Sequence, residues 1–226
     1  MQHSRDTIRK GRKFDQVLAG ARQVFLADGF EGASVDDIAR AAGVSKATLY
    51  SYFPDKRLLF MEVARLECDQ MADRIMQGID GDLPLREMLL RTARNLTSFL
   101  LSDFSQAVFR VCVAERDRFP ELGQAFYAAG PEMGRNRMSE FLTEAVAQGA
   151  LRISDIPMAA EQFTELCRVK LWTRAVFGVQ SAFTAAEIED VAVNAVDTFL
   201  ARYGTGVEVT LDAGACPTCG PGKAVG

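Results

Sequence analysis

The chain has 226 residues, of which 48% are hydrophobic and 25% are charged. This balance excludes a disordered chain, and the length suffices for one large domain or for a small domain plus a larger one. No apolar run approaches ~18 residues and the start, MQHSRDTIRKGRKF, lacks an apolar centre, so we expect neither a membrane span nor a secretory signal. Five irregularly spaced cysteines do not suggest a disulfide framework, and we expect a cytoplasmic location.

Charge is distributed unevenly along the chain, whose net charge is −4. Residues 1–60 hold ten Lys or Arg against seven Asp or Glu, which gives +3; the other sixteen cations and twenty-three acids give −7. Five of the cations lie within residues 5–13. Such an arm is often simply solvated, but beside a DNA-binding element it suits phosphate contacts. The pattern predicts a basic head and an acidic body.

Apolar periodicity and helix-end signals predict an all-α chain of about nine helices. The expected helices cover about 10–28, 34–42, 46–53, 54–77, 84–102, 105–118, 120–148, 157–177 and 185–202. We expect Gly130-Pro131 to interrupt or restart the seventh helix, and Thr184 with Glu187 to form a capping box for the last. From Gly204 onward, small residues predict a disordered tail.

Residues 34–53, SVDDIARAAGVSKATLYSYF, are typical of two short helices joined by a tight turn. Ser34 is placed to cap the first helix, with Asp37 in the capping-box position, and Ser45 is placed to cap the second. Gly43 stands where the turn requires a positive φ. By spacing alone the segment is either a structural αα-hairpin or a helix-turn-helix. Its outward residues suit a DNA groove, because small groups allow close approach while hydroxyls and a cation contact phosphates. These residues are Lys46, Ala47, Thr48, Tyr50 and Tyr52.

From about Arg9 to Leu66 the chain resembles the DNA-binding domain of the TetR family of transcriptional regulators. The family pattern is matched at Ala21, Phe25, Gly29, Phe30, Ser34, Ile38, Ala39, Ala42, Gly43, Val44, Ser45, Thr48, Leu49, Tyr50, Phe53, Lys56 and Leu59. The resemblance implies groove-facing roles for Lys46, Ala47 and Thr48. It implies phosphate contacts for Ser34, Ser45, Tyr50, Tyr52 and Lys56, with Lys13 and the arm adding charge.

The expected organisation is a basic arm (1–13), a DNA-binding domain (10–66) whose motif is 34–53, an effector and dimerisation domain (67–203), and a flexible tail (204–226). In helices 157–177 and 185–202 the apolar residues cover more than the arc of about 100° that one neighbouring core requires. Either a larger core or a partner subunit buries the excess. The resemblance implies a homodimer that reads two half-sites. The expected interface residues are Phe163, Leu166, Trp172, Val191, Ala195 and Phe199.

Helices between residues 54 and 148 carry many aromatic and sulfur side chains, which ordinarily fill a core. The family resemblance implies that the body encloses a pocket for a small-molecule effector. Its candidate residues are Cys68, Phe99, Phe109, Cys112, Phe126 and Trp172. Arg65, Arg94 and Arg110 interrupt these apolar helices, and they either bind an anionic ligand group or pair with neighbouring acids.

Other chemistry has little support in the sequence. Cys216 and Cys219 form a CxxC pair, but it lies in a Gly- and Pro-rich segment and the only histidine is His3, so a zinc or redox site is not favoured. With no histidine in the body, we expect no catalytic Ser/His or Cys/His pair, and we expect no cofactor. The sequence therefore predicts a ligand-responsive repressor that binds double-stranded operator DNA. The alternatives are a metal- or redox-sensing regulator and a ligand-binding dimer without DNA activity.

Overall fold

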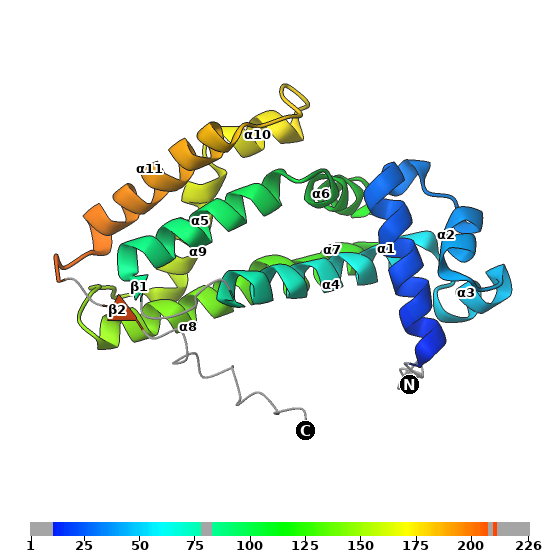
Figure 1. Cartoon of the computed structure of the whole chain (residues 1–226), viewed down its shortest axis with the longest axis horizontal. Helices are drawn as coiled ribbons and strands as arrows, with labels where there is room; N and C mark the ends of the chain where they lie inside the picture. The colour runs from blue at the N-terminus through cyan, green and yellow to red at the C-terminus, as the bar shows by residue number, and fades with distance from the viewer. Residues whose placement is uncertain (1–10, 78–82, 208–209, 212–226) are drawn as a thin grey trace. The chain divides into compact units, whose positions relative to one another are not determined.

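A computed structural model describes residues 11–77, 83–207 and 210–211, and within this part the chain is almost wholly helical (Figure 1). The residues divide into two compact units. One contains the described residues up to Glu67 together with Asp103–Phe126; the other contains Cys68–Ser102 and the residues from Tyr127 onward. Glu67 and residues 103–126, which the sequence placed in the effector and dimerisation domain, group with the first unit, and the functional domains stay a prediction.

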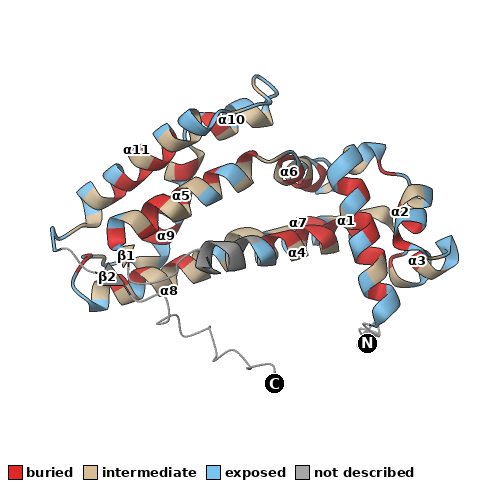
Figure 2. Cartoon of the chain, viewed as in Figure 1, coloured by how far each residue is buried: buried red, intermediate tan, exposed pale blue. Residues whose placement is uncertain are grey.

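The first unit packs helices around an apolar stripe on α1 (Arg12–Gly32). It includes α2 (Val35–Ala42), α3 (Lys46–Tyr52), the first half of α4 (Lys56–Gln77), α6 (Asp103–Glu115) and α7 (Pro120–Tyr127, whose last residue falls in the second unit). The buried face of α1 contacts apolar residues of α2, α3, α4 and α6 in one core. Figure 2 shows this face as the buried stripe along α1.

The second unit has a core built from α5 (Leu85–Leu101), α8 (Met133–Ala147), α9 (Ile156–Arg168) and α11 (Ala185–Tyr203). It also contains the short α10 (Leu171–Val176), the short π-helix η1 (Ala128–Glu132), and strands β1 (Leu83–Pro84) and β2 (Thr210–Leu211). The two strands pair antiparallel, with Leu83 opposite Leu211. The core side chains of α11 are Val191, Ala192, Ala195, Val196 and Phe199.

The described residues form eleven α-helices where about nine were expected, because the seventh predicted helix is interrupted at Gly130-Pro131, as predicted, and the eighth is divided at residue 170. Pro131 has no N–H for the helix ladder, and a short π-helix, η1, accommodates it between α7 and α8. The predicted helix 157–177 is wrong at residue 170. There the Leu171 N–H donates to the Val169 carbonyl at 2.8 Å, and Lys170 has φ 70° and ψ −52°. These values are close to a γ-turn with a positive φ, a rare and strained conformation.

The tail prediction is wrong for its first residues. Gly204 bridges to Leu151, and Thr205 donates its backbone N–H to the Ala150 carbonyl at 3.1 Å and its hydroxyl to the Gly149 carbonyl at 2.7 Å. Most of the predicted tail and the first ten residues of the basic arm lie outside the described residues. No single described helix is long and apolar enough to cross a membrane, and α5 and α6 pass that test only as a bent pair.

Candidate DNA-binding site

In the first unit, called the head from here on, one row of buried side chains fixes the orientation of α3. Leu49 and Phe53 are buried, and the Phe14 ring of α1 stacks on Phe53 at 5.4 Å and meets Tyr52 edge-on at 5.7 Å between centroids. These contacts fix which side of α3 faces the core. They therefore also fix which side of α3 faces solvent (Figure 2).

Local hydrogen bonds set the geometry of the α2–turn–α3 segment. The Ser34 hydroxyl accepts the Asp37 N–H at 3.1 Å, and the Ser45 hydroxyl accepts the Thr48 N–H at 3.1 Å, so both predicted caps are confirmed. Gly43 has φ 63° and ψ 33°, which confirms the left-handed turn. The Val44 N–H donates to Ala39 and the Gly43 N–H to Arg40, the two bonds of a Schellman motif.

Asp37 does not complete a capping box. Its carboxylate accepts from the Ser34 hydroxyl at 2.5 Å and from Arg40 at 2.7 Å, whereas the capping box requires a bond from the Ser34 backbone N–H. The side chain of Asp is one methylene shorter than that of Glu, which makes that backbone hard to reach. The Ser34 and Arg40 bonds hold the pKa of Asp37 below its usual value.

Gly20 permits the close packing of α1 on α2, a role that no sequence pattern indicates. A Cβ at Gly20 would lie 2.5 Å from the Ala42 nitrogen and 2.7 Å from its Cα. Real Cβ atoms do not approach backbone so closely, so any other residue would push α2 away from α1. Because α3 follows α2 through the short turn at Gly43, Gly20 indirectly sets the position of α3.

The exposed side of α3 carries most of the predicted DNA contacts. Ser45, Lys46 and Ala47 are exposed at its start, and Tyr50 retains 45% of its accessible surface. Thr48 is half-buried and its hydroxyl lies 2.9 Å from that of Ser45. Ser34 and Lys13 are exposed on neighbouring segments. The head thus brings a cation, small residues, hydroxyls and a phenol onto one accessible surface around the start of α3.

Lys46 is held by an acid of the preceding helix. Its Nζ lies 2.7 Å from Oδ1 of Asp36 on α2, and both side chains are more than half exposed. The hydrogen bond with Asp36 raises the pKa of Lys46 above its usual value. An exposed pair of this kind contributes little to stability and exchanges readily for another acceptor.

Lys56 and Tyr52 have roles inside the head that the sequence did not indicate. The Lys56 ammonium donates to the carbonyls of Phe30 at 2.8 Å and Ala33 at 3.0 Å, and lies 4.4 Å from the centre of the Phe30 ring. An ammonium has three protons, so the phosphate contact expected of Lys56 has only one left to it. Tyr52 is half-buried against Phe14, which leaves less of its surface for DNA than Tyr50 has.

Two arginines fasten α4 within the same unit. Arg22 of α1 forms a two-pronged ion pair with the buried Glu67. Arg57 pairs with Asp55 and with Glu115 of α6, and its guanidinium lies 3.6 Å from the centre of the Phe119 ring. The Asp55 and Glu115 contacts raise the pKa of Arg57 and keep it charged. These ion pairs join α4 to α1 and α6, the helices whose shared core also holds α2 and α3.

The predicted pocket residues fall into two groups. Phe109, Cys112 and Phe126 belong to the first unit, and Cys68, Phe99 and Trp172 to the second. Cys112 is buried 3.7 Å from the Met61 sulfur, and Phe126 packs against the same core. The Arg168 guanidinium lies 5.2 Å from the centre of the Trp172 ring. The structure does not bring the six together within one unit, and the pocket stays a prediction.

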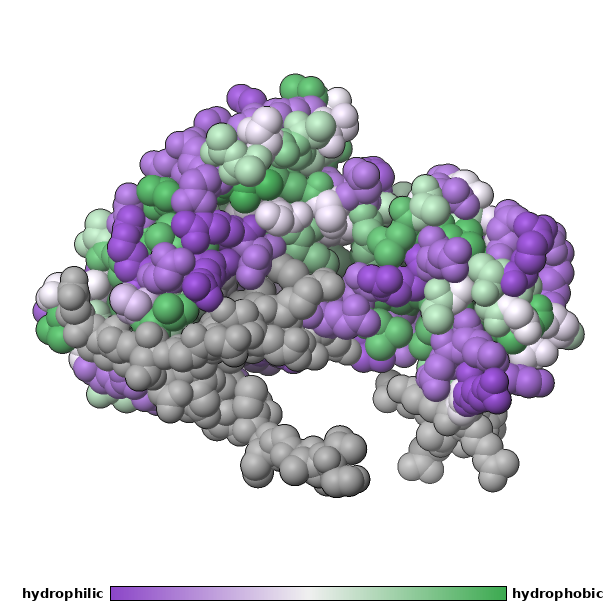
Figure 3. All heavy atoms as spheres, viewed as in Figure 1, coloured by the Kyte–Doolittle hydropathy of each residue, from purple (hydrophilic) through white to green (hydrophobic). Residues whose placement is uncertain are grey.

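The dimer-interface prediction requires correction. Phe163, Val191, Ala195 and Phe199 are each at most 5% exposed, because α5, α9 and α11 bury them in the chain's own core or beside it. They have almost no surface left for a partner. Leu166 and Trp172 remain half-exposed. The exposed large apolar residues of the second unit lie elsewhere, and Figure 3 shows hydrophobic residues on the surface around α10. These exposed residues are Tyr127, Met158, Val169, Phe177, Val179 and Val207.

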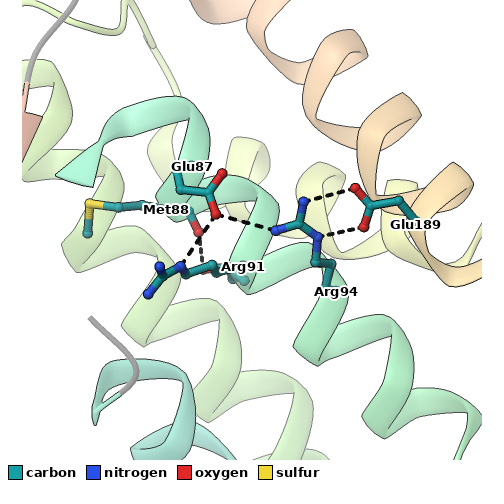
Figure 4. A network of polar contacts seen from close by, with 6 residues as sticks. Glu87, Met88, Arg91, Arg94 and Glu189 are labelled. Carbon is teal, nitrogen blue, oxygen red and sulfur yellow. Dashed lines mark hydrogen bonds and ion pairs between the residues drawn. The ribbon is translucent and has the colours of Figure 1, made fainter. Parts of the chain in front are cut away.

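Of the three arginines within apolar helices, the two whose ion pairs are described contact neighbouring acids, as one of the two interpretations expected. Arg94 of α5 donates to both oxygens of Glu189 on α11, at 2.6 and 2.8 Å, and also contacts Glu87, which Arg91 shares (Figure 4). The Glu189 contact raises the pKa of Arg94. Arg65 pairs with Glu62 on α4, and Arg110 is exposed.

Two of the described cysteines, Cys112 and Cys167, do not resemble redox-active thiols. Burial raises the pKa of Cys112 to about 11 and that of Cys167 to about 12, which keeps both protonated at neutral pH. Within the described ranges no group of three or more His, Cys, Asp or Glu side chains is arranged to hold a metal ion. The Cys216–Cys219 pair lies outside those ranges.

Matches to known families agree with this geometry. Residues 17–63 match the family described as "Bacterial regulatory proteins, tetR family", and residues 87–205 match "AefR-like transcriptional repressor, C-terminal domain". The fold and the exposed α3 therefore define a helix-turn-helix regulator of transcription. With matches to both parts of the chain, it belongs to the TetR family, as the sequence predicted.

Individual relatives support the same assignment. A TetR-family transcriptional regulator from Mesorhizobium loti is 28% identical and superimposes on 85% of this chain and 97% of its own with a TM-score of 0.75. The flavonoid-responsive regulator FrrA is 36% identical over 88% of this chain and 100% of its own, with a TM-score of 0.64. The repressor AcnR of Corynebacterium efficiens is 36% identical over 63 residues, 28% of this chain and 34% of AcnR. The chain thus spans about a third of the length of that curated relative.

Proposed function

We propose that this protein binds a two-fold symmetric DNA operator as a homodimer, represses transcription there, and leaves the DNA when a small-molecule effector binds. The exposed start of α3 carries the proposal. A short helix fastened by Leu49 and Phe53 presents Lys46, Ala47 and Tyr50 to solvent. Helices of this kind enter the major groove, where base edges can be read.

The residues divide by role in this proposal. Lys46 is the base reader, and Ala47 and Thr48 allow close approach to the groove. Ser34, Ser45, Tyr50, Tyr52 and Lys13 contact phosphates, with Lys56 contributing its remaining proton. Repression is supported by the repressor description of the matched C-terminal family and by the name of AcnR.

Dimerisation supplies the second half-site. Members of this family bind DNA as dimers, and in the second unit the apolar side chains of Phe177 and Val179 are exposed and those of Leu166 and Trp172 half-exposed. A single α3 offers too few base contacts for operator specificity, whereas two related by a two-fold axis double them. Sedimentation equilibrium of the whole chain tests this step, and a monomer bound to DNA with one head would contradict it.

Effector binding belongs to the second unit in this proposal. FrrA responds to flavonoids according to its name, which supports a small-molecule effector here without identifying it. Binding would favour a conformer whose two α3 helices do not match the operator spacing. No described residue supports the metal- or redox-sensing alternative, and the exposed Lys46 surface disfavours a dimer without DNA activity.

The test begins with duplexes enriched by the wild-type protein from a random-sequence library. We expect a palindrome-like sequence, and no enrichment would contradict DNA recognition. Lys46→Ala should lose roughly tenfold in discrimination at one base pair of each half-site while other positions keep theirs.

Lys13→Ala is the matched control, because it removes the same charge from an exposed position on α1. It should weaken binding to all duplexes alike. The slope of log affinity against log salt concentration should become shallower by about 0.9 for each phosphate that the protein no longer binds. If Lys46→Ala behaves in the same way, Lys46 is a phosphate contact and the base-reading role is wrong.

A further inference from the structure

The ion pair between Asp36 and Lys46 points to a specificity device at the edge of the DNA-binding surface. Both groups are accessible, since their side chains are 61% and 51% exposed, and they connect α2 to the start of α3 at 2.7 Å. The other acid in the first turn of α2, Asp37, is engaged by Ser34 and Arg40. Asp36 is therefore the acid that neutralises the one cation of α3.

We propose that Asp36 is a specificity-determining residue that competes with DNA phosphates for Lys46, so that Lys46 engages DNA only where a base acceptor replaces the carboxylate. The inference rests on the proposed function and assigns it a residue that the sequence pattern does not indicate.

Placement supports a functional interpretation of the pair. Lys46 is the first residue of α3, where the partial positive charge of the helix end disfavours a cation. The first turn of α3 contains no acid of its own. Asp36 supplies the compensating charge from the preceding helix, and it holds the ammonium at an accessible position instead of burying it. A cation retained at an unfavourable helix position, with its counter-ion beside it, is suited to exchange of partners.

The exchange of Asp36 for a DNA partner of Lys46 differs between operator DNA and DNA of arbitrary sequence. On an arbitrary sequence Lys46 can gain only a phosphate, and leaving Asp36 unpaired beside the negative backbone offsets that gain. On the operator, Lys46 gains a directed bond to a base edge, which phosphate attraction alone cannot supply. Asp36 therefore reduces non-operator binding more than operator binding. Because an exposed ion pair is weak, Asp36 lowers the affinity for non-operator DNA without preventing Lys46 from binding the operator.

A purely structural role for Asp36 makes a different prediction. Its position in the first turn of α2 also stabilises that helix end. If this were its whole role, Asp36→Asn would lower the melting temperature and would change binding to all duplexes only through the folded fraction. The salt dependence of binding would not change.

The experiment compares Asp36→Asn with Glu31→Gln in the full-length protein. Glu31 is an exposed acid on α1, so the second variant makes the same charge change in the same unit. Each variant is titrated over several salt concentrations with the duplex enriched by the wild type and with a scrambled duplex of equal composition. Melting temperatures are recorded alongside.

With Asp36→Asn we expect affinity for the scrambled duplex to rise roughly three- to tenfold at low salt. The salt slope on that duplex should steepen by about 0.9, as expected for one added phosphate contact. Affinity for the enriched duplex should change less, so the ratio of the two falls. Asp36→Glu should restore the ratio, and in a Lys46→Gln background Asp36→Asn should do no more than Glu31→Gln does.

Two results would overturn the assignment. One is that Asp36→Asn and Glu31→Gln match in slope and in ratio; the other is that the effect of Asp36→Asn persists without Lys46. In either case the proposed DNA-binding function stands while the Asp36 role falls. If the wild type enriches no sequence at all, both fall together.

Discussion

The head and the body differ in what fixes their functional surfaces. In the head, α3 is placed by local bonds at Ser45 and Gly43 and by two core side chains, and the residues left outside are the ones proposed to meet DNA. In the body, four of the six apolar residues that suggested a partner surface are buried in the chain's own cores. A residue's outward position follows from local chemistry in the first case and from long-range packing in the second.

Stability is also maintained differently in the two units. Both units have apolar cores; in addition, the head brings α1 and α2 into backbone contact at Gly20, and the body joins α5 to α11 by side-chain ion pairs such as Arg94 with Glu189. Backbone contact tolerates no added atom, while exposed ion pairs can be removed at small cost. Added bulk at Gly20 should therefore cost more stability than removal of the Arg94–Glu189 pair.

The largest effect is expected at Gly20. Gly20→Ala places a Cβ 2.5–2.7 Å from backbone atoms of Ala42, and we expect destabilisation of about 1–3 kcal/mol with a parallel loss of operator binding. Gly123→Ala is the matched control, because no atom lies within 4 Å of that Cβ and α7 gains helix propensity. Chemical denaturation of both variants measures the difference. Equal stabilities would show that α1 and α2 can separate freely, which contradicts a tightly set head.

A smaller difference between Gly and Ala is expected at Lys170 in the body. It is the only described non-glycine residue with a positive φ, and its Nζ pairs with Asp190 at 3.1 Å. Lys170→Gly removes the strain along with the pair, whereas Lys170→Ala removes the pair and keeps the strain. We expect the Gly variant to be more stable than the Ala variant by about 1 kcal/mol. Thermal unfolding of the two measures it, and the reverse order would mean that the γ-turn at residue 170 is not strained.

The same difference explains which parts of the structure the sequence could predict. Caps and turns depend on neighbouring residues, so Ser34, Gly43, Ser45 and the Thr184–Glu187 box were all predicted correctly. The break at Lys170 was not, because Leu171, Trp172 and Val176 continue the apolar pattern of α9 and no Gly or Pro marks the turn. Packing within the second unit decides that break.

Burial in the core and burial by a partner require the same side chains, so the apolar pattern of α11 could not separate them. Phe199 and Val191 fit either interpretation until the positions of α5 and α9 are known. The Asp36–Lys46 pair was missed for a related reason. Residues ten apart on two different helices carry no spacing signal, and only the turn geometry at Gly43 brings them together.

The smallest effect concerns the capping box of α11. Bonds from the Gln180 amide, the Thr184 N–H and the Thr184 hydroxyl lower the pKa of Glu187 to about 2 from an ordinary value of 4.5. A lowered folded-state pKa stabilises the protein above the unfolded value, and this contribution is lost as the pH falls from about 4.5 to about 2.

Glu187→Gln should therefore be less stable than the wild type at pH 7, with a gap that closes over this acid range. Gln180→Ala, which removes the largest of the three contributions and keeps the carboxylate, should show a smaller gap over the same range. Thermal unfolding from pH 7 to pH 2 measures both. A stability difference that stays constant with pH would mean that the shape of Glu187, and not its charge, stabilises the start of α11. The local rule that succeeds at Ser34 and Ser45 would then have a different physical basis in the body.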